Sequence, residues 1–178
     1  MKETKEKLTG AERGTIMHLV LQKLDYNIEY SLEKIKELLE ELQAKKIITE
    51  VQKQSVSTEK ILAFTKSEIF KKLKSAKKVY REKAFYINIP AKEIYNNDVE
   101  EAVLVQGIID LYFVDENNNV VLVDYKTDYV LEGQEECLVR KYKKQLKLYA
   151  RAIKEATNND VDKTYIYSTY LGKEIIIE

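Results

Sequence analysis

The sequence predicts an α/β (α+β) fold in a single domain spanning residues 1–178, with a helical N-terminal region and a sheet flanked by helices. Apolar residues recur at helical spacing as far as Lys74. Aromatic and β-branched runs with partial alternation follow from Val79. A long helical pattern at 135–157 then separates three early strands from two late ones. A chain of 178 residues can bury one sizeable core, but is short for two domains.

The first part of the chain, residues 11–78, is predicted to be mainly helical after a frayed leader at 1–10. Its helices are expected at 12–24, 31–45, 49–55 and 58–74. One face of the second helix is apolar, which is typical of a helix packed on a core; the residues are Leu32, Ile35, Leu38, Leu39 and Leu42.

The second part, residues 79–178, is predicted to have the order β-β-β-α-β-β. Strands are expected at 79–89, 102–114, 120–127, 163–170 and 174–178, with the helix at 135–157 and a turn at Leu-Gly-Lys before the last strand. Residues 91–100 are polar and predict a loop or an insertion. With one proline and five glycines, the chain has few helix or strand breakers.

The stretch Val103–Asp128 places one carboxylate in each of two neighbouring apolar strands. Asp124 and Lys126 are two residues apart and therefore share a face of their strand. Asp110 lies opposite Asp124 if the turn is centred on Asn117, which predicts an odd-length loop or a bulge. Two acids and a lysine at one place suit a divalent cation and a phosphodiester; the alternative is a structural ion pair between Asp110 and Lys126.

Composition excludes several classes of site. A single cysteine rules out an intrachain disulfide and a four-cysteine zinc or iron–sulfur site from this chain alone. Thirty basic and thirty acidic residues give no global electrostatic argument for a nucleic-acid partner. Without an apolar signal or a spanning segment, we expect a cytoplasmic protein with no membrane partner.

Four motifs in order resemble the PD-(D/E)XK nuclease superfamily, in its RecB-like branch. Gly-Ile-Ile-Asp110 followed by Val-Asp124-Tyr-Lys126 resembles the superfamily core, and the helix segment 142–152 resembles the Gln-plus-Tyr motif of the branch. Upstream, the Gly-x-x-x-His ending at His18 and the Arg-Glu82-Lys-Ala-Phe strand resemble two further motifs, with alanine where a proline is usual. The resemblance implies a restriction-endonuclease-like core with a mixed β-sheet.

The motifs are most similar to the AddA-type nuclease domain of AddAB helicase–nuclease complexes. The chain contains no GxxxxGK[ST] phosphate loop, so we expect it to be excised from a larger helicase–nuclease chain. The implied partners are the helicase part of that chain, the AddB-type subunit of the helicase–nuclease heterodimer, and a DNA single strand delivered from a duplex end. The AddB-type subunit carries an iron–sulfur cluster in its nuclease domain, and none is expected here.

The resemblance also implies roles for the site residues. Asp110 and Asp124 would bind Mg²⁺, with His18 and the backbone carbonyl of Tyr125 as further ligands; Mn²⁺ could substitute. Lys126 would hold the attacking water and stabilise charge in the transition state. Three further residues are expected at the site, Gln145 and Tyr149 from one helix face and Glu82 as a neighbouring acid. Independently of the resemblance, 13 tyrosines and no tryptophan allow stacking on unpaired bases, for which the sequence singles out only Tyr125.

Together these observations predict a Mg²⁺-dependent deoxyribonuclease, an exonuclease that processes double-strand-break ends. Two alternatives remain open at this point. One is a free-standing RecB-like exonuclease, and the other is a catalytically silent DNA-binding or scaffold module. The intact acid–acid–lysine set and the Gln-Tyr helix favour the enzyme.

Overall fold

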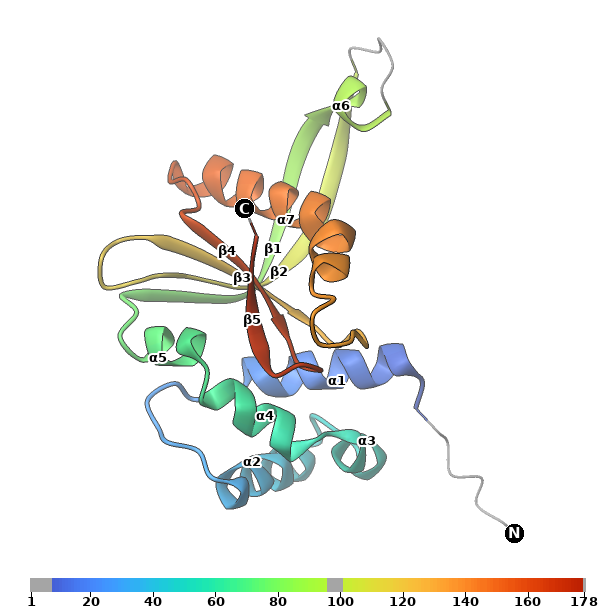
Figure 1. The fold of residues 1–178 in the computed structure, drawn as a ribbon, viewed down its shortest axis with the longest axis vertical. Coiled ribbons are helices and arrows are strands. Elements are labelled where there is room, and N and C mark those ends of the chain that lie inside the picture. Colours follow the sequence, from blue (N-terminus) through green and yellow to red (C-terminus); the bar gives the residue numbers. More distant parts are fainter. Residues whose placement is uncertain (1–7, 96–100, 178) are drawn as a thin grey trace.

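The computed structural model describes residues 8–95 and 101–177 (Figure 1). Within these ranges, five helices come first: α1 (Gly10–Gln22), α2 (Leu32–Ala44), α3 (Glu50–Ser55), α4 (Thr58–Thr65) and α5 (Glu68–Lys74). The remaining elements are β1 (Lys78–Pro90), α6 (Ala91–Tyr95), β2 (Ala102–Val114), β3 (Val120–Lys126), α7 (Glu136–Thr157), β4 (Lys163–Ser168) and β5 (Lys173–Ile177). The predicted order of helices followed by β-β-β-α-β-β is therefore present, with a further short helix, α6, between β1 and β2.

The sheet is mixed and runs in the order β1-β2-β3-β4-β5. Strands β3 and β4 pair in parallel, and α7 supplies the crossover that such a connection requires. In Figure 1, α7 lies over one face of the sheet and α1–α5 lie on the other side, while β1 and β2 extend together as a long arm that ends at α6. The predicted fold class, a mixed sheet flanked by helices, is confirmed.

Alternating residues of β3 divide the core into two halves. Val121, Val123 and Tyr125 pack in the cluster formed with α1–α5. Val120 and Leu122 pack in the cluster formed with α7. Burial on both faces explains why this strand reads as a continuous apolar run rather than as an alternating one. Asp124 and Lys126 have the same parity as Leu122, so their side chains leave β3 on the α7 side.

The hairpin between β2 and β3 has the predicted register. Val114 pairs with Val120 and Leu111 pairs with Val123, so the turn is centred on Asn117 and its loop is odd in length. Asp115 organises this turn, because its carboxylate accepts hydrogen bonds from the backbone N–H groups of Asn117 and Asn119, both at 2.9 Å. Continued by one residue, the register sets Asp110 opposite Asp124.

Three local predictions were wrong. The leader was expected to extend to residue 10 and the first helix to start at 12, but Thr9 and Glu12 form a capping box and α1 begins at Gly10. The single helix expected at 58–74 is divided into α4 and α5, because Ser67 caps a new helix there. The polar loop expected at 91–100 begins instead with α6, and its residues 96–100 lie outside the described part of the chain.

Within residues 8–95 and 101–177, no helix combines the length and apolar character needed to cross a membrane.

Candidate active site

Helix α1 brings His18 to the sheet through a close approach at Gly14. A Cβ atom at Gly14 would lie 2.9 Å from Thr127 Oγ1, so only glycine allows α1 to pack this closely on the segment that follows β3. One turn later the His18 ring meets the Tyr125 ring edge-on, with centroids 5.8 Å apart. The spacing of the Gly-x-x-x-His motif thus has a physical reason, since glycine and histidine lie on the same face of the helix.

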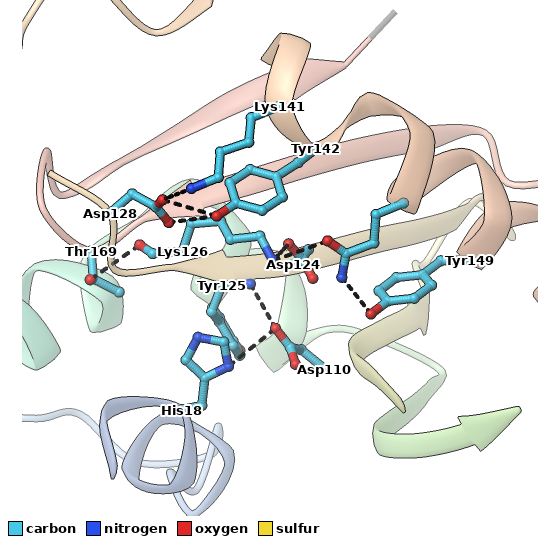
Figure 2. Close-up of polar contacts among 11 residues, drawn as sticks. His18, Asp110, Asp124, Tyr125, Lys126, Asp128, Lys141, Tyr142, Tyr149 and Thr169 are labelled. Atoms are coloured by element: carbon cyan, nitrogen blue, oxygen red, sulfur yellow. Dashed lines mark hydrogen bonds and ion pairs between the residues drawn. The ribbon is translucent and has the colours of Figure 1, made fainter. Parts of the chain in front are cut away.

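Asp110 lies where β2 separates from β3. The β2–β3 ladder ends at the pair Leu111–Val123, and the Asp110 carboxylate takes over as acceptor for the backbone N–H of Tyr125 at 2.9 Å. The same oxygen lies 3.4 Å from Nδ1 of His18 (Figure 2). Burial opposes charge on the imidazole, but the Asp110 and Asp124 carboxylates outweigh it and raise the pKa of His18.

Asp124 and Lys126 form a buried ion pair beside Asp110. Lys126 Nζ lies 2.6 Å from Asp124 Oδ2, and the Asp124 side chain is only 2% exposed. Apart from this ion pair, Asp124 Oδ2 is buried with no hydrogen-bond partner among the described residues. Burial, together with repulsion from Asp110, raises the pKa of Asp124 to about 6, although Lys126 opposes the shift. In the described part of the chain, the alternative ion pair between Asp110 and Lys126 does not form.

Helix α7 contributes a polar stripe to the same site. Gln145 Nε2 donates to the Tyr149 hydroxyl at 2.6 Å, and Gln145 Oε1 lies 3.5 Å from Lys126 Nζ. Lys126 Nζ also lies 4.1 Å from the centroid of the Tyr142 ring, which is within cation–π range. The structure therefore brings Gln145 and Tyr149 together with the lysine, as the helix spacing predicts.

Glu82 lies in β1 beside Asp110 and has an unusual backbone. Its φ of +49° is in the left-handed region, where non-glycine residues are uncommon and strained. Arg81 pairs with Leu111 and Lys83 pairs with Ile109, which sets Glu82 across from Asp110. Burial and the Asp110 charge raise the pKa of Glu82, so the two acids lie near enough to repel each other.

The stacking role suggested for Tyr125 is wrong, because its side chain is 2% exposed and belongs to the core. Conversely, sequence reasoning missed Tyr142. Its hydroxyl donates to Asp128, whose carboxylate also pairs with Lys141 Nζ, and this fixes the ring over Lys126 (Figure 2). The helix spacing could have identified Tyr142, because positions 142, 145 and 149 share one face of a helix.

An open pocket of about 260 Å³ gives access to the site; its lining includes His18, Tyr125, Lys126, Asp128 and Tyr142. The described residues contain no group of three or more acidic, histidine or cysteine side chains already gathered at metal-ligand spacing. Instead, Asp110 is engaged by His18 and by a backbone N–H, and Asp124 by Lys126. The predicted metal ligands therefore lie near one another, but their side chains contact other protein groups and do not form a preformed metal site.

The order of the elements and the acid–acid–lysine geometry agree with a comparison of the whole sequence. The family model of the PD-(D/E)XK nuclease superfamily matches residues 2–175. The chain belongs to this superfamily. The family resemblance of its sequence motifs is thus confirmed, and superfamily members generally use divalent metal ions.

Similar proteins share one name, that of the A subunit of an ATP-dependent helicase/nuclease. The one from Clostridium novyi (strain NT) is 45% identical over 99% of this chain and 15% of its own length. That from Thermoanaerobacter sp. (strain X514) is 42% identical over 96% of this chain and 14% of its own length. The protein from Alkaliphilus oremlandii (strain OhILAs) is 44% identical over 93% of this chain and 14% of its own length. This superfamily member spans about one seventh of the length of these relatives.

Proposed function

We propose that this chain is a Mg²⁺-dependent deoxyribonuclease domain that hydrolyses phosphodiester bonds in DNA. The observation that carries the proposal is the buried Asp124–Lys126 pair, which lies beside Asp110 at the end of β3 and next to an open pocket. Two carboxylates and one ammonium leave this cluster with an excess of negative charge. A bound cation would offset that charge, and the ammonium would face an anionic phosphate.

The donor set suits a hard divalent cation. Within the described ranges, buried Asp124 Oδ2 has only Lys126 as a partner, and Asp110 and the Tyr125 carbonyl would add further oxygen ligands. His18 would add an imidazole, a ligand that Mn²⁺ accepts as well. When bound, the cation polarises the phosphate and lowers the pKa of its water.

The surroundings of Lys126 narrow its role. Burial opposes its charge, but Asp124 and Asp110 outweigh burial and raise the pKa of Lys126. In this proposal the side chain therefore acts as an ammonium rather than as the general base. It acts by donating to the attacking water and by stabilising the charge that develops on the phosphate, while Gln145 and the Tyr142 ring hold it in place.

Two facts support a role as one domain of a larger helicase–nuclease: the names of the relatives, and the small share of their length that this chain covers. In this proposal the chain is the nuclease part of an AddA-type helicase–nuclease chain, in the cytoplasm and paired with an AddB-type subunit. The helicase part delivers a single strand from a duplex end, and the domain cuts it as an exonuclease during double-strand-break processing.

The test is cleavage of end-labelled single-stranded DNA by the 178-residue chain with Mg²⁺ or Mn²⁺, and with EDTA. Lys126→Ala is compared with Lys36→Ala, a surface lysine on α2, and both are purified identically. We expect metal-dependent products from the unmodified chain and from Lys36→Ala. Loss of the transition-state ammonium should lower the rate at least about a hundredfold in Lys126→Ala.

Equal cleavage by Lys126→Ala and the unmodified chain would refute the proposed site. No cleavage by either, together with metal-independent binding of DNA, would favour the silent DNA-binding module instead.

A further inference from the structure

A second pocket lies next to the active-site pocket, on another side of α1. It has a volume of about 290 Å³ and shares Gly14 and Thr127 with the active-site pocket. Thr15 and His18 of α1 face the active-site pocket, whereas Arg13 and Met17 face the second one. A chain-like substrate leaving the active site over Gly14 would therefore enter the second pocket directly.

The lining of the second pocket suits an anion. Among the described residues, its charged lining consists of Arg13, from the first turn of α1, and Lys60, from the first turn of α4, with no acid. Four residues with hydroxyl groups also line it: Ser55, Ser57, Thr127 and Thr169. Ser55 and Thr169 already donate to backbone carbonyls, and Ser57 donates to the Glu59 carboxylate beside the pocket, so the two cations are the main source of attraction for a phosphate.

Two exposed tyrosines border this pocket. Tyr129 is 68% exposed and Tyr170 is 41% exposed, and their ring centroids are 4.7 Å apart. Each lies within two residues of a pocket residue, Tyr129 after Thr127 and Tyr170 after Thr169. Lys60 joins the two features, because it lines the pocket and its Nζ lies 5.0 Å from the Tyr170 ring centroid.

We propose that this surface holds the stretch of single-stranded DNA next to the scissile phosphate. The neighbouring phosphate lies between Arg13 and Lys60, and an unpaired base stacks on Tyr129 and Tyr170. A positively charged groove with aromatic rings on its border is the combination that binds single strands without reading their sequence. This inference rests on the proposed nuclease function and adds the residues that hold the strand beside the scissile phosphate.

The test is fluorescence anisotropy of a labelled oligothymidine with the 178-residue chain in EDTA, so that no strand is cut. Tyr129→Ala/Tyr170→Ala should weaken binding about tenfold, because stacking of a base is lost. The matched control is Tyr86→Ala, which removes an equally exposed tyrosine from the β1–β2 arm and should leave binding unchanged. An oligonucleotide with abasic sites should bind the tyrosine double variant and the unmodified chain equally.

The two cations are tested separately through salt. Arg13→Gln and Lys60→Gln should each weaken binding of both oligonucleotides and lower the slope of log K against log salt by about 0.7, as expected for one phosphate contact on a single strand. Lys36→Gln, the matched charge control on α2, should leave the slope unchanged.

Cleavage with Mn²⁺ is measured on the same variants, which separates the two proposals. Unchanged binding in the tyrosine and cation variants of a chain that cuts DNA would overturn this surface and leave the nuclease intact. If the unmodified chain cuts no DNA but the variants bind DNA more weakly, the surface is supported and the chain is a catalytically silent DNA-binding module.

Discussion

At the scale of single residues, Gln145 is the contact through which α7 reaches Lys126. Its amide nitrogen donates to the Tyr149 hydroxyl and its oxygen faces Lys126 Nζ. The Tyr149 ring is itself held by Phe85, at 5.4 Å between centroids. Gly107 leaves room for that contact, since a Cβ there would lie 2.8 Å from the Phe85 ring. A glycine in a strand thereby supports a residue of the site.

Tyr149→Phe isolates this connection. The ring stays against Phe85, so we expect the melting temperature to fall by no more than about 2–4 °C. Loss of the hydroxyl frees the Gln145 amide to rotate, and a hydrogen bond of about 1 kcal/mol corresponds to a roughly fivefold lower cleavage rate. Single-turnover cleavage under saturating DNA measures the effect. A wild-type rate would show that the orientation of Gln145 does not matter for the reaction.

At the scale of elements, the position of α1 depends on one contact between a glycine and a threonine. Gly14→Ala would place a methyl group 2.9 Å from Thr127 Oγ1. The overpacking costs about 1–3 kcal/mol, and the better helix propensity of alanine returns about 1 kcal/mol. We expect lower activity in Gly14→Ala, because the shifted helix carries His18 away from Asp110.

Thr127→Ala should rescue that variant, because it removes the hydroxyl and leaves Thr127 Cβ, which lies 3.9 Å from the position that the added methyl group would take. In a double-mutant cycle of urea unfolding and cleavage rate, Gly14→Ala/Thr127→Ala should be at least as stable as Thr127→Ala alone. Additive losses in the double variant would contradict a direct contact as the cause.

The β2–β3 hairpin makes a prediction about pH, because Asp115 holds its turn. Burial raises the pKa of Asp115, but hydrogen bonds from Asn119 and Asn117 outweigh it, and the pKa is lowered overall. A lowered folded-state pKa means that the stabilisation is complete above the unfolded pKa of about 4 and is lost as the pH falls through the folded value. Asp115→Ala should therefore cost about 1–3 kcal/mol at pH 7.

The difference between Asp115→Ala and the unmodified chain should narrow below about pH 4, where protonation weakens the acceptor in the unmodified chain. Urea unfolding at about pH 7 and about pH 3 measures it, with Asp160→Ala, an acid outside the turn, as the control. A gap of constant size across this range would mean that the carboxylate charge does not stabilise the turn.

At the scale of the whole molecule, the sequence predicted those features of the fold that depend on local periodicity and on strand register. The order of the helices and strands along the chain, the long helix and a hairpin centred on Asn117 all follow from such patterns. The break between α4 and α5 has a local signal, the Ser67 cap, but it also depends on the backbone N–H of Ile69, which donates to Glu174 of β5, 105 residues away. The positive φ of Glu82 and the choice of Asp124 as the partner of Lys126 also depend on tertiary contacts.

Both halves of the core pack on β3. A cation bound at the end of this strand should therefore raise the unfolding free energy of the whole domain. Mn²⁺ at about 100 times its Kd would stabilise the fold by about 2.7 kcal/mol, because it binds the folded chain and not the unfolded one. For a domain of this length that is a rise in Tm of about 5–10 °C. Asp110→Asn keeps an oxygen for the Tyr125 N–H but removes a charge, so it should abolish most of the rise. Asp128→Asn, a carboxylate outside the proposed ligands, should keep it. Calorimetry with and without EDTA measures the rise in Tm. A rise in Asp110→Asn equal to that of the unmodified chain would show that the cation binds elsewhere.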